Sequence, residues 1–205
     1  MDEIEKKSLK SFFLSNKKIL IIFFTIIILI GVFFWWSQNL NIKEKYKNSE
    51  EFIGAKVLLS QNNKAKSLEV LKKIILQNDE VYSPLSLFLI IDKDLETNKK
   101  NVIKYFDQVL SIKSLEKEDR NLLKLKKAIY LSEDAEENDL LNLLNPILNS
   151  NSVWKYQSLK FIGDYYFDKK EYNKAKQYYS DILMLDNTNN DIKDINRKIK
   201  IINNG

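Results

Sequence analysis

Hydrophobic residues are distributed unevenly along the chain, and the densest run lies near the N-terminus. Residues 19–36, ILIIFFTIIILIGVFFWW, contain no charged side chain and one weakly polar residue, Thr25. A helix of this length rises about 27 Å, which is close to the thickness of the hydrocarbon core of a bilayer. The pattern therefore predicts a membrane-spanning helix over residues 19–36.

The residues that flank this run are typical of membrane interfaces. Lys17 and Lys18 precede it, and Trp35 and Trp36 end it, where indole rings favour the boundary between lipid and water. A cleaved signal peptide is one alternative, but the run is longer than a usual signal-peptide core and no small-residue cleavage site follows. A buried core helix is the other alternative, but the rest of the chain offers little to surround so apolar a helix.

Apolar positions beyond this run recur with helical spacing, most clearly in the segment FIGDYYFDKKEYNKAKQYYSDILML, residues 161–185. Gly163 and Tyr166 are three residues apart, and Ala175 and Tyr179 are four apart, which places each pair on one helix face. The segment between the pairs has room for a short turn. We therefore predict a helical hairpin in which the small residues permit close approach and the tyrosines pack around the contact.

This hairpin resembles a tetratricopeptide repeat (TPR), a helical hairpin of about 34 residues. The slots of the TPR pattern are filled by Leu159, Ile162, Gly163, Tyr166, Ala175 and Tyr179. Two slots depart from it, because Ile182 stands where a small residue is usual and Asn187 where a proline is usual. A single repeat cannot bury its own apolar face, so the resemblance predicts further repeats.

Weaker repeats precede the strong one in a similar register. Offsets of 35, 38 and 35 residues lead back from Gly163 to Ala128, Ile90 and Ala55. The corresponding later slots are apolar except at Ser67. Four hairpins are thus predicted, over residues 48–78, 82–112, 117–149 and 152–186. An accidental periodicity in a generic helical bundle is the alternative.

The whole pattern predicts an all-α protein. A linker helix over residues 37–47 would join the membrane helix to a TPR-like α-solenoid over residues 48–205. A capping helix over residues 190–203 would close it, with a stripe formed by Ile192, Ile195, Ile199 and Ile202. Pro146 is expected to kink or interrupt the second helix of the third hairpin. Only four Gly and two Pro argue against an all-β fold.

Charge and composition narrow the function. The net charge is +5, and residues 1–18 carry five lysines against three acidic residues, so this segment is predicted to be cytoplasmic and the large domain to lie outside. The absence of Cys and His excludes disulfides, thiolate zinc sites and histidine-based triads. The acidic segment 132–139 is interpreted as a solvated turn, and residues 186–191 lack the Gly and Glu of a calcium loop. We expect no enzymatic activity, cofactor, metal, nucleic acid or small-molecule substrate.

A protein-binding surface remains as the candidate site. In TPR proteins the concave wall is lined by first-helix residues between the packing slots. The resemblance places Lys160, Asp164 and Phe167 there in the fourth hairpin. The many aromatic residues around them are explained by core packing or, alternatively, by a binding surface.

The architecture of one N-terminal span and a TPR-like domain resembles the bacterial ancillary SecYEG translocon subunit family. That resemblance implies a single-pass protein of the bacterial inner membrane, with its C-terminal domain in the periplasm. Its role would be to sit beside the Sec translocon and pass emerging proteins to periplasmic chaperones. The alternative is a scaffold for another envelope complex, such as cell-division or secretion machinery.

Overall fold

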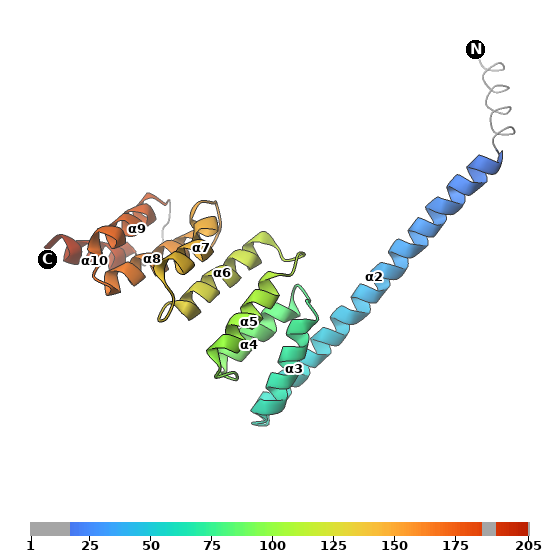
Figure 1. The fold of residues 1–205 in the computed structure, drawn as a ribbon, viewed down its shortest axis with the longest axis horizontal. Coiled ribbons are helices and arrows are strands. Elements are labelled where there is room, and N and C mark those ends of the chain that lie inside the picture. The colour runs from blue at the N-terminus through green and yellow to red at the C-terminus, as the bar shows by residue number, and fades with distance from the viewer. Residues whose placement is uncertain (1–16, 186–191, 205) are drawn as a thin grey trace, which may run out of the picture. The chain divides into compact units, whose positions relative to one another are not determined.

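The computed structural model describes residues 17–185 and 192–204, and within them every regular element is an α-helix (Figure 1). This confirms the all-α class for the described part of the chain. Most of the predicted segment 1–18 lies outside it, as do residues 186–191, and so do the side chains of residues 19, 20 and 37–44. The helices are α2 (Lys17–Ser60), α3 (Lys64–Leu76), α4 (Tyr82–Asp92), α5 (Lys99–Leu110), α6 (Lys117–Leu131), α7 (Glu137–Leu148), α8 (Lys155–Asp168), α9 (Tyr172–Met184) and α10 (Ile192–Asn204).

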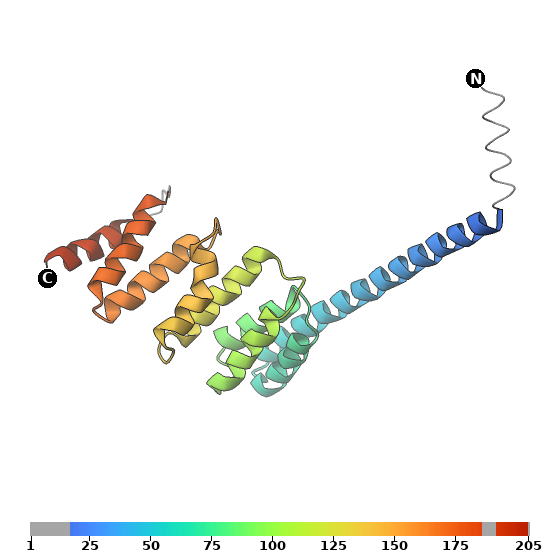
Figure 2. The ribbon, with the colours of Figure 1, turned by 45° about the horizontal axis from the view of Figure 1, so that its top comes forward.

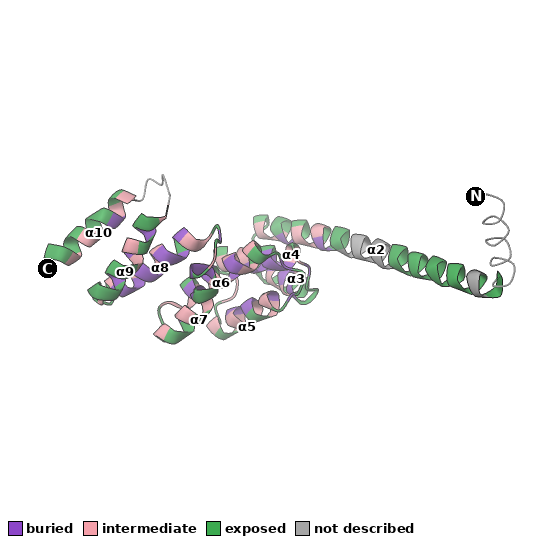
Figure 3. Cartoon of the chain, turned by 90° about the horizontal axis from the view of Figure 1, so that it is seen from above, coloured by how far each residue is buried: buried purple, intermediate pink, exposed green. Residues whose placement is uncertain are grey.

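The chain divides into two compact units, residues 1–54 and 55–205, each of which is described by itself. The first unit contains most of α2, and every side chain from Ile21 to Trp36 is exposed there (Figure 3). Trp35 and Trp36 are 69% and 57% exposed. Within the described residues, no helix combines the length and the apolarity that crossing a membrane requires. The span over residues 19–36 therefore stays a prediction.

The second unit is a stack of antiparallel helices, consistent with an α-solenoid (Figure 2). Consecutive helices from α3 to α10 pack against one another along the chain. The turns from α3 to α4, from α5 to α6 and from α7 to α8 lie along one edge of the stack in Figure 1. The turns from α4 to α5, from α6 to α7 and from α8 to α9 lie along the other edge. The second helix of each hairpin is thus followed by the first helix of the next.

Short helices pack here because each presents a narrow apolar stripe to its neighbours. In α9 the buried residues are Ala175, Tyr179 and Ile182, which recur every three or four residues. Ser67 of α3 is buried at the slot that Ala175 fills in the fourth hairpin. Its hydroxyl donates to the carbonyl oxygen of Ala55 at 2.9 Å, so this polar side chain is accommodated by a hydrogen bond.

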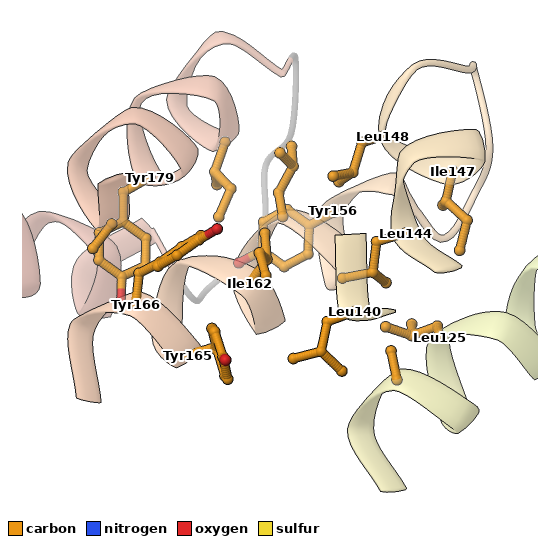
Figure 4. Packing of buried hydrophobic residues seen from close by; sticks show 14 of the residues in the cluster. Leu125, Leu140, Leu144, Ile147, Leu148, Tyr156, Ile162, Tyr165, Tyr166 and Tyr179 are labelled. Atoms are coloured by element: carbon orange, nitrogen blue, oxygen red, sulfur yellow. The ribbon is translucent and has the colours of Figure 1, made fainter. Parts of the chain in front are cut away.

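A hydrophobic core cluster joins the third and fourth hairpins with α10 (Figure 4). Tyr166 of α8 and Tyr179 of α9 are buried, as are Gly163 and Ala175. A Cβ atom added at Gly163 would lie 2.7 Å from Cε1 of Tyr179, well inside van der Waals contact. Gly163 therefore lets the ring of Tyr179 lie directly against the backbone of α8.

The predicted interruption at Pro146 does not occur. Helix α7 continues through Pro146 and ends at Leu148. Proline removes one backbone donor, and here it stands in the last turn at an exposed position, where water can replace the lost partner. The apolar stripe still packs, because Leu140, Leu144, Ile147 and Leu148 of α7 are all buried.

A carboxylate whose side chain is only 10% exposed, that of Glu96, fixes the turn between α4 and α5. Glu96 accepts hydrogen bonds from Lys72 Nζ of α3 at 2.9 Å, the backbone N–H of Asn98 at 3.1 Å and Asn101 Nδ2 at 3.1 Å. The hydrogen bond from Lys72 contributes most to lowering the pKa of Glu96, burial opposes it, and the net pKa is about 2. The ionised form of Glu96 thus ties the first hairpin to the second.

Replacing Gly163 with alanine should destabilise the second unit, because the new methyl group forces the Tyr179 ring or helix α9 to move. We expect a loss of about 1–3 kcal/mol in the free energy of unfolding, measured by urea denaturation followed by circular dichroism. The matched control is Gly54→Ala in α2, where a Cβ meets no atom within 4 Å. Equal stability of Gly163→Ala and the unmodified chain would show that the close approach does not matter.

Glu96→Gln should lower stability at pH 7 by about 1–3 kcal/mol, because a charged hydrogen-bond network is lost. The folded-state pKa of about 2 lies below the ordinary value of 4.5, so the ionised form stabilises the fold above that ordinary value. The difference between the two proteins should therefore shrink as the pH falls from 4.5 toward 2. Urea unfolding across this range measures it, with exposed Asp92→Asn as control. A difference independent of pH contradicts the assignment.

Candidate protein-binding surface

The three residues predicted to face a partner lie on one side of α8. Lys160, Asp164 and Phe167 are separated by four and three residues, so the helix brings them onto one face. All three are partly buried. The structure therefore places them together, and their contacts decide what this face can do.

Asp164 is the centre of a hydrogen-bond network that joins three helices. It accepts from Lys160 Nζ of its own helix at 2.9 Å, from the hydroxyl of Tyr179 in α9 at 2.7 Å and from Lys198 Nζ in α10 at 2.6 Å. Burial by itself would raise the pKa of Asp164, but these three donors outweigh it and hold the pKa below its ordinary value. Asp164 is thus an ionised structural link.

Helix α10 supplies the contacts around this link. The ammonium group of Lys198 lies 5.7 Å from the ring centroid of Phe167, within the range of a cation–π interaction. Asp194 Oδ2 lies 3.9 Å from Lys160 Nζ and 3.5 Å from Lys198 Nζ. The predicted binding residues are therefore engaged by α10, and the face that they form is covered in part by the chain itself.

The apolar stripe of α10 explains this arrangement. Ile195 is completely buried, and Ile199 and Ile202 pack against the same core cluster. With the stripe directed at the fourth hairpin, Asp194 and Lys198 fall at its border and reach α8. The stripe was predicted from the sequence, but these two residues were not. Asp194 and Lys198 are four residues apart, and this spacing on one helix face was the signal that could have found them.

An open part of the first-helix face remains between the end of α6 and α8. A cavity of about 350 Å³ there is lined by Phe161, Asp164, Tyr165 and Asp168 of α8 and by Ser132 and Glu133. Lys169 Nζ lies 4.5 Å from the ring centroid of Tyr165. This cavity combines aromatic rings with carboxylates, and it adjoins the predicted residues without being filled by α10.

The acidic segment 132–139 is only partly a solvated turn. Glu137, in the first turn of α7, accepts hydrogen bonds from the hydroxyl of Tyr166 at 2.7 Å and from Lys174 Nζ at 2.9 Å. The bond from Lys174 contributes most to holding the pKa of Glu137 below its ordinary value. The earlier interpretation is therefore corrected for Glu137, which fastens the third hairpin to the fourth.

The remaining predicted residues occupy the following places. Ala55 and Ala128 are completely buried in the second unit. Lys17, Lys18, Trp35 and Trp36 are exposed on α2. Within the described part of the chain, no group of three or more acidic side chains is arranged to hold a metal ion.

Lys198→Met keeps the length and the apolar stem of the side chain but removes the cation that faces Asp164 and Phe167. We expect this change to weaken the docking of α10 and to lower the free energy of unfolding by about 1–2 kcal/mol. Limited proteolysis should also cleave sooner near α10. Lys200→Met, at an exposed position of the same helix, is the matched control. If both variants behave alike, the link to Asp164 does not hold α10.

Comparisons of this chain with protein-family models, with curated proteins and with solved structures find no match. The resemblance to the translocon subunit family therefore stays a prediction from the sequence, and the residues and contacts described above carry the functional argument.

Proposed function

We propose that this protein is a non-enzymatic, membrane-anchored interaction module whose TPR-like domain binds other proteins. The observation that carries the proposal is the exposure of every side chain from Ile21 to Trp36 in α2. A helix that is apolar all round is stable when another apolar medium surrounds it. A bilayer provides such a medium, and Lys17, Lys18, Trp35 and Trp36 are suited to its two interfaces.

The TPR-like character of the domain is supported by how its strongest hairpin packs. The ring of Tyr179 lies against Gly163, and Ala175 and Tyr166 are buried beside that contact. These are the residues on which the resemblance rests. Repeat domains of this kind present long surfaces of helix side chains, and binding through such surfaces requires no catalytic group.

The partners that we propose are the SecYEG translocon and periplasmic chaperones. An anchored domain meets other membrane proteins at a high effective concentration, so a modest binding surface suffices. The cavity between α6 and α8 offers aromatic and charged groups for such contacts. Because α10 covers Lys160, Asp164 and Phe167 in part, we assign the partner contact to the uncovered side of α8, around Phe161.

A protease-accessibility experiment on intact spheroplasts tests the anchor and its direction. With a C-terminal tag on the full chain, we expect external protease to remove the tagged domain while a cytoplasmic control protein survives. Residues 1–18 would then be cytoplasmic and the domain periplasmic. Protection of the domain until the spheroplasts are lysed would overturn this topology and exclude the periplasmic role.

The partner assignment has its own test. A photo-crosslinking amino acid at Phe161 should give adducts with SecY or with periplasmic chaperones in living cells. The same crosslinker at exposed Gln177 of α9 should not. Adducts with cell-division or secretion proteins, or equal adducts at both positions, would contradict the translocon assignment.

A further inference from the structure

Four exposed asparagines form a row along α7 and its C-terminal cap. Asn138, Asn142 and Asn145 lie in the helix and Asn149 is its C-cap residue, so they follow one another at intervals of four, three and four residues. At 3.6 residues per turn they fall within an arc of about 60° and extend along about 16 Å of helix axis. Among the described residues, no side-chain hydrogen bond engages these four amides.

This row, the asparagine ridge, is an unusual surface for this protein. The exposed positions of the neighbouring helices α5, α6 and α9 are rich in lysine. The sequence of α7, ENDLLNLLNPIL, contains no basic residue, and its two acidic residues, Glu137 and Asp139, stand in its first turn. A side-chain amide carries one acceptor and two donors, the same groups that a peptide bond presents. The ridge is therefore complementary to an uncharged backbone that both donates and accepts hydrogen bonds.

Pro146 adds an acceptor to the ridge. It lies on the exposed side of α7 and has no N–H, so the carbonyl oxygen of Asn142 loses its partner within the helix. That oxygen belongs to a residue of the ridge itself. The proline that was expected to disturb α7 thus removes the usual backbone donor to an acceptor that lies beside the amides.

Two grooves that combine apolar and charged lining residues flank the ridge. On the side of α5, a groove of about 650 Å³ is lined by Ile103, Leu131, Leu143 and Asn142, together with charged residues that include Lys127 and Asp139. On the side of α9, a groove of about 450 Å³ is lined by Leu148, Leu159, Tyr178 and Met184, by Asn145 and Asn149, and by the charged residues Lys155 and Asp181. Met184 is 81% exposed, and its flexible thioether can adapt to varied side chains. The ridge therefore separates two places where apolar side chains can be buried.

We propose that α7 and its two grooves bind an extended, unfolded polypeptide segment of a partner protein. The segment lies along the ridge with one backbone edge facing the asparagines. In an extended chain, successive side chains point to opposite sides, so they enter the two grooves alternately. Peptide groups on one edge recur about every 6.7 Å. The asparagines recur about every 4.5 to 6 Å along α7, within reach of their flexible side chains.

The positions of the grooves select a spacing in the bound segment. The α7 residues that line the groove beside α5 and those that line the groove beside α9 are centred about six residues apart. This separation corresponds to about 9 Å along the helix. Three residues of extended chain cover about 10 Å, and residues three apart point to opposite sides. The site thus prefers apolar side chains at positions i and i+3, with little demand on the residues between them.

This inference rests on the proposed protein-binding role and deepens it, because an unfolded segment is what an emerging protein offers. It uses the second-helix side of the stack, which differs from the α8 face considered above. Binding in detergent solution does not depend on the direction of membrane insertion. Failure of the spheroplast test and failure of this inference can therefore be told apart.

The test measures binding of a fluorescein-labelled nonapeptide to the full chain in non-ionic detergent by fluorescence anisotropy. The peptide consists of serine and threonine, with isoleucine at its fourth and leucine at its seventh position. We expect the triple variant Asn142→Ala, Asn145→Ala, Asn149→Ala to bind about tenfold more weakly or worse. The double variant Asn173→Ala, Gln177→Ala removes exposed amides from α9 and should bind like the unmodified chain.

Three altered peptides sharpen the result. Moving leucine to the sixth position puts both apolar side chains on one side and should weaken binding. In the other two, the backbone nitrogens of every second residue are methylated, on one edge or on the opposite edge of the extended peptide. Methylation of the edge that faces the ridge should abolish binding, and methylation of the other edge should not. The inference is overturned if the unmodified chain does not bind the nonapeptide, if the triple variant binds it as well as the control variant, or if none of the altered peptides changes the affinity.

Discussion

The close approach of α8 and α9 at Gly163 is the contact on which the C-terminal half of the domain depends. Because Gly163 has no side chain, the ring of Tyr179 lies against α8, and this position brings its hydroxyl to Asp164. Asp164 in turn accepts from Lys198 and holds α10. The absence of a Cβ atom at Gly163 thus determines where Tyr179 and Asp164 lie, and through them where α10 docks.

The same chain of contacts determines which surfaces remain for function. The end of a helical stack exposes apolar area unless something covers it, and α10 does so with Ile195 and its neighbours. In covering it, α10 also engages Lys160, Asp164 and Phe167. At the fourth hairpin, the helix that stabilises the end of the stack therefore also covers part of the first-helix face. The part of that face that α10 leaves uncovered lies near Phe161 and the end of α6.

Sequence patterns predicted the elements well where an apolar stripe or a small residue left a strong signal. Helices α8 and α9 lie inside the segment predicted for the fourth hairpin, and α10 lies where the isoleucine stripe suggested a helix. Polar contacts between distant segments were not predictable in this way. Hydrogen bonds such as those from Lys174 to Glu137 and from Lys198 to Asp164 join residues more than 30 positions apart. The spacing of apolar residues along a helix gives no information about such pairs.

The asparagine ridge shows a different limit of sequence reasoning. Asparagine is frequent throughout this chain, so its abundance alone carries no information. What distinguishes α7 is the position of its asparagines, which occupy one exposed arc between two grooves. The other walls of these grooves come from α5, α6, α8 and α9. Helical spacing could have revealed the arc, but the grooves exist only after the neighbouring helices have packed. The proposed binding surface for backbone amides thus arises from tertiary structure, because only the folded stack places a groove on both sides of a helix that has no basic residue.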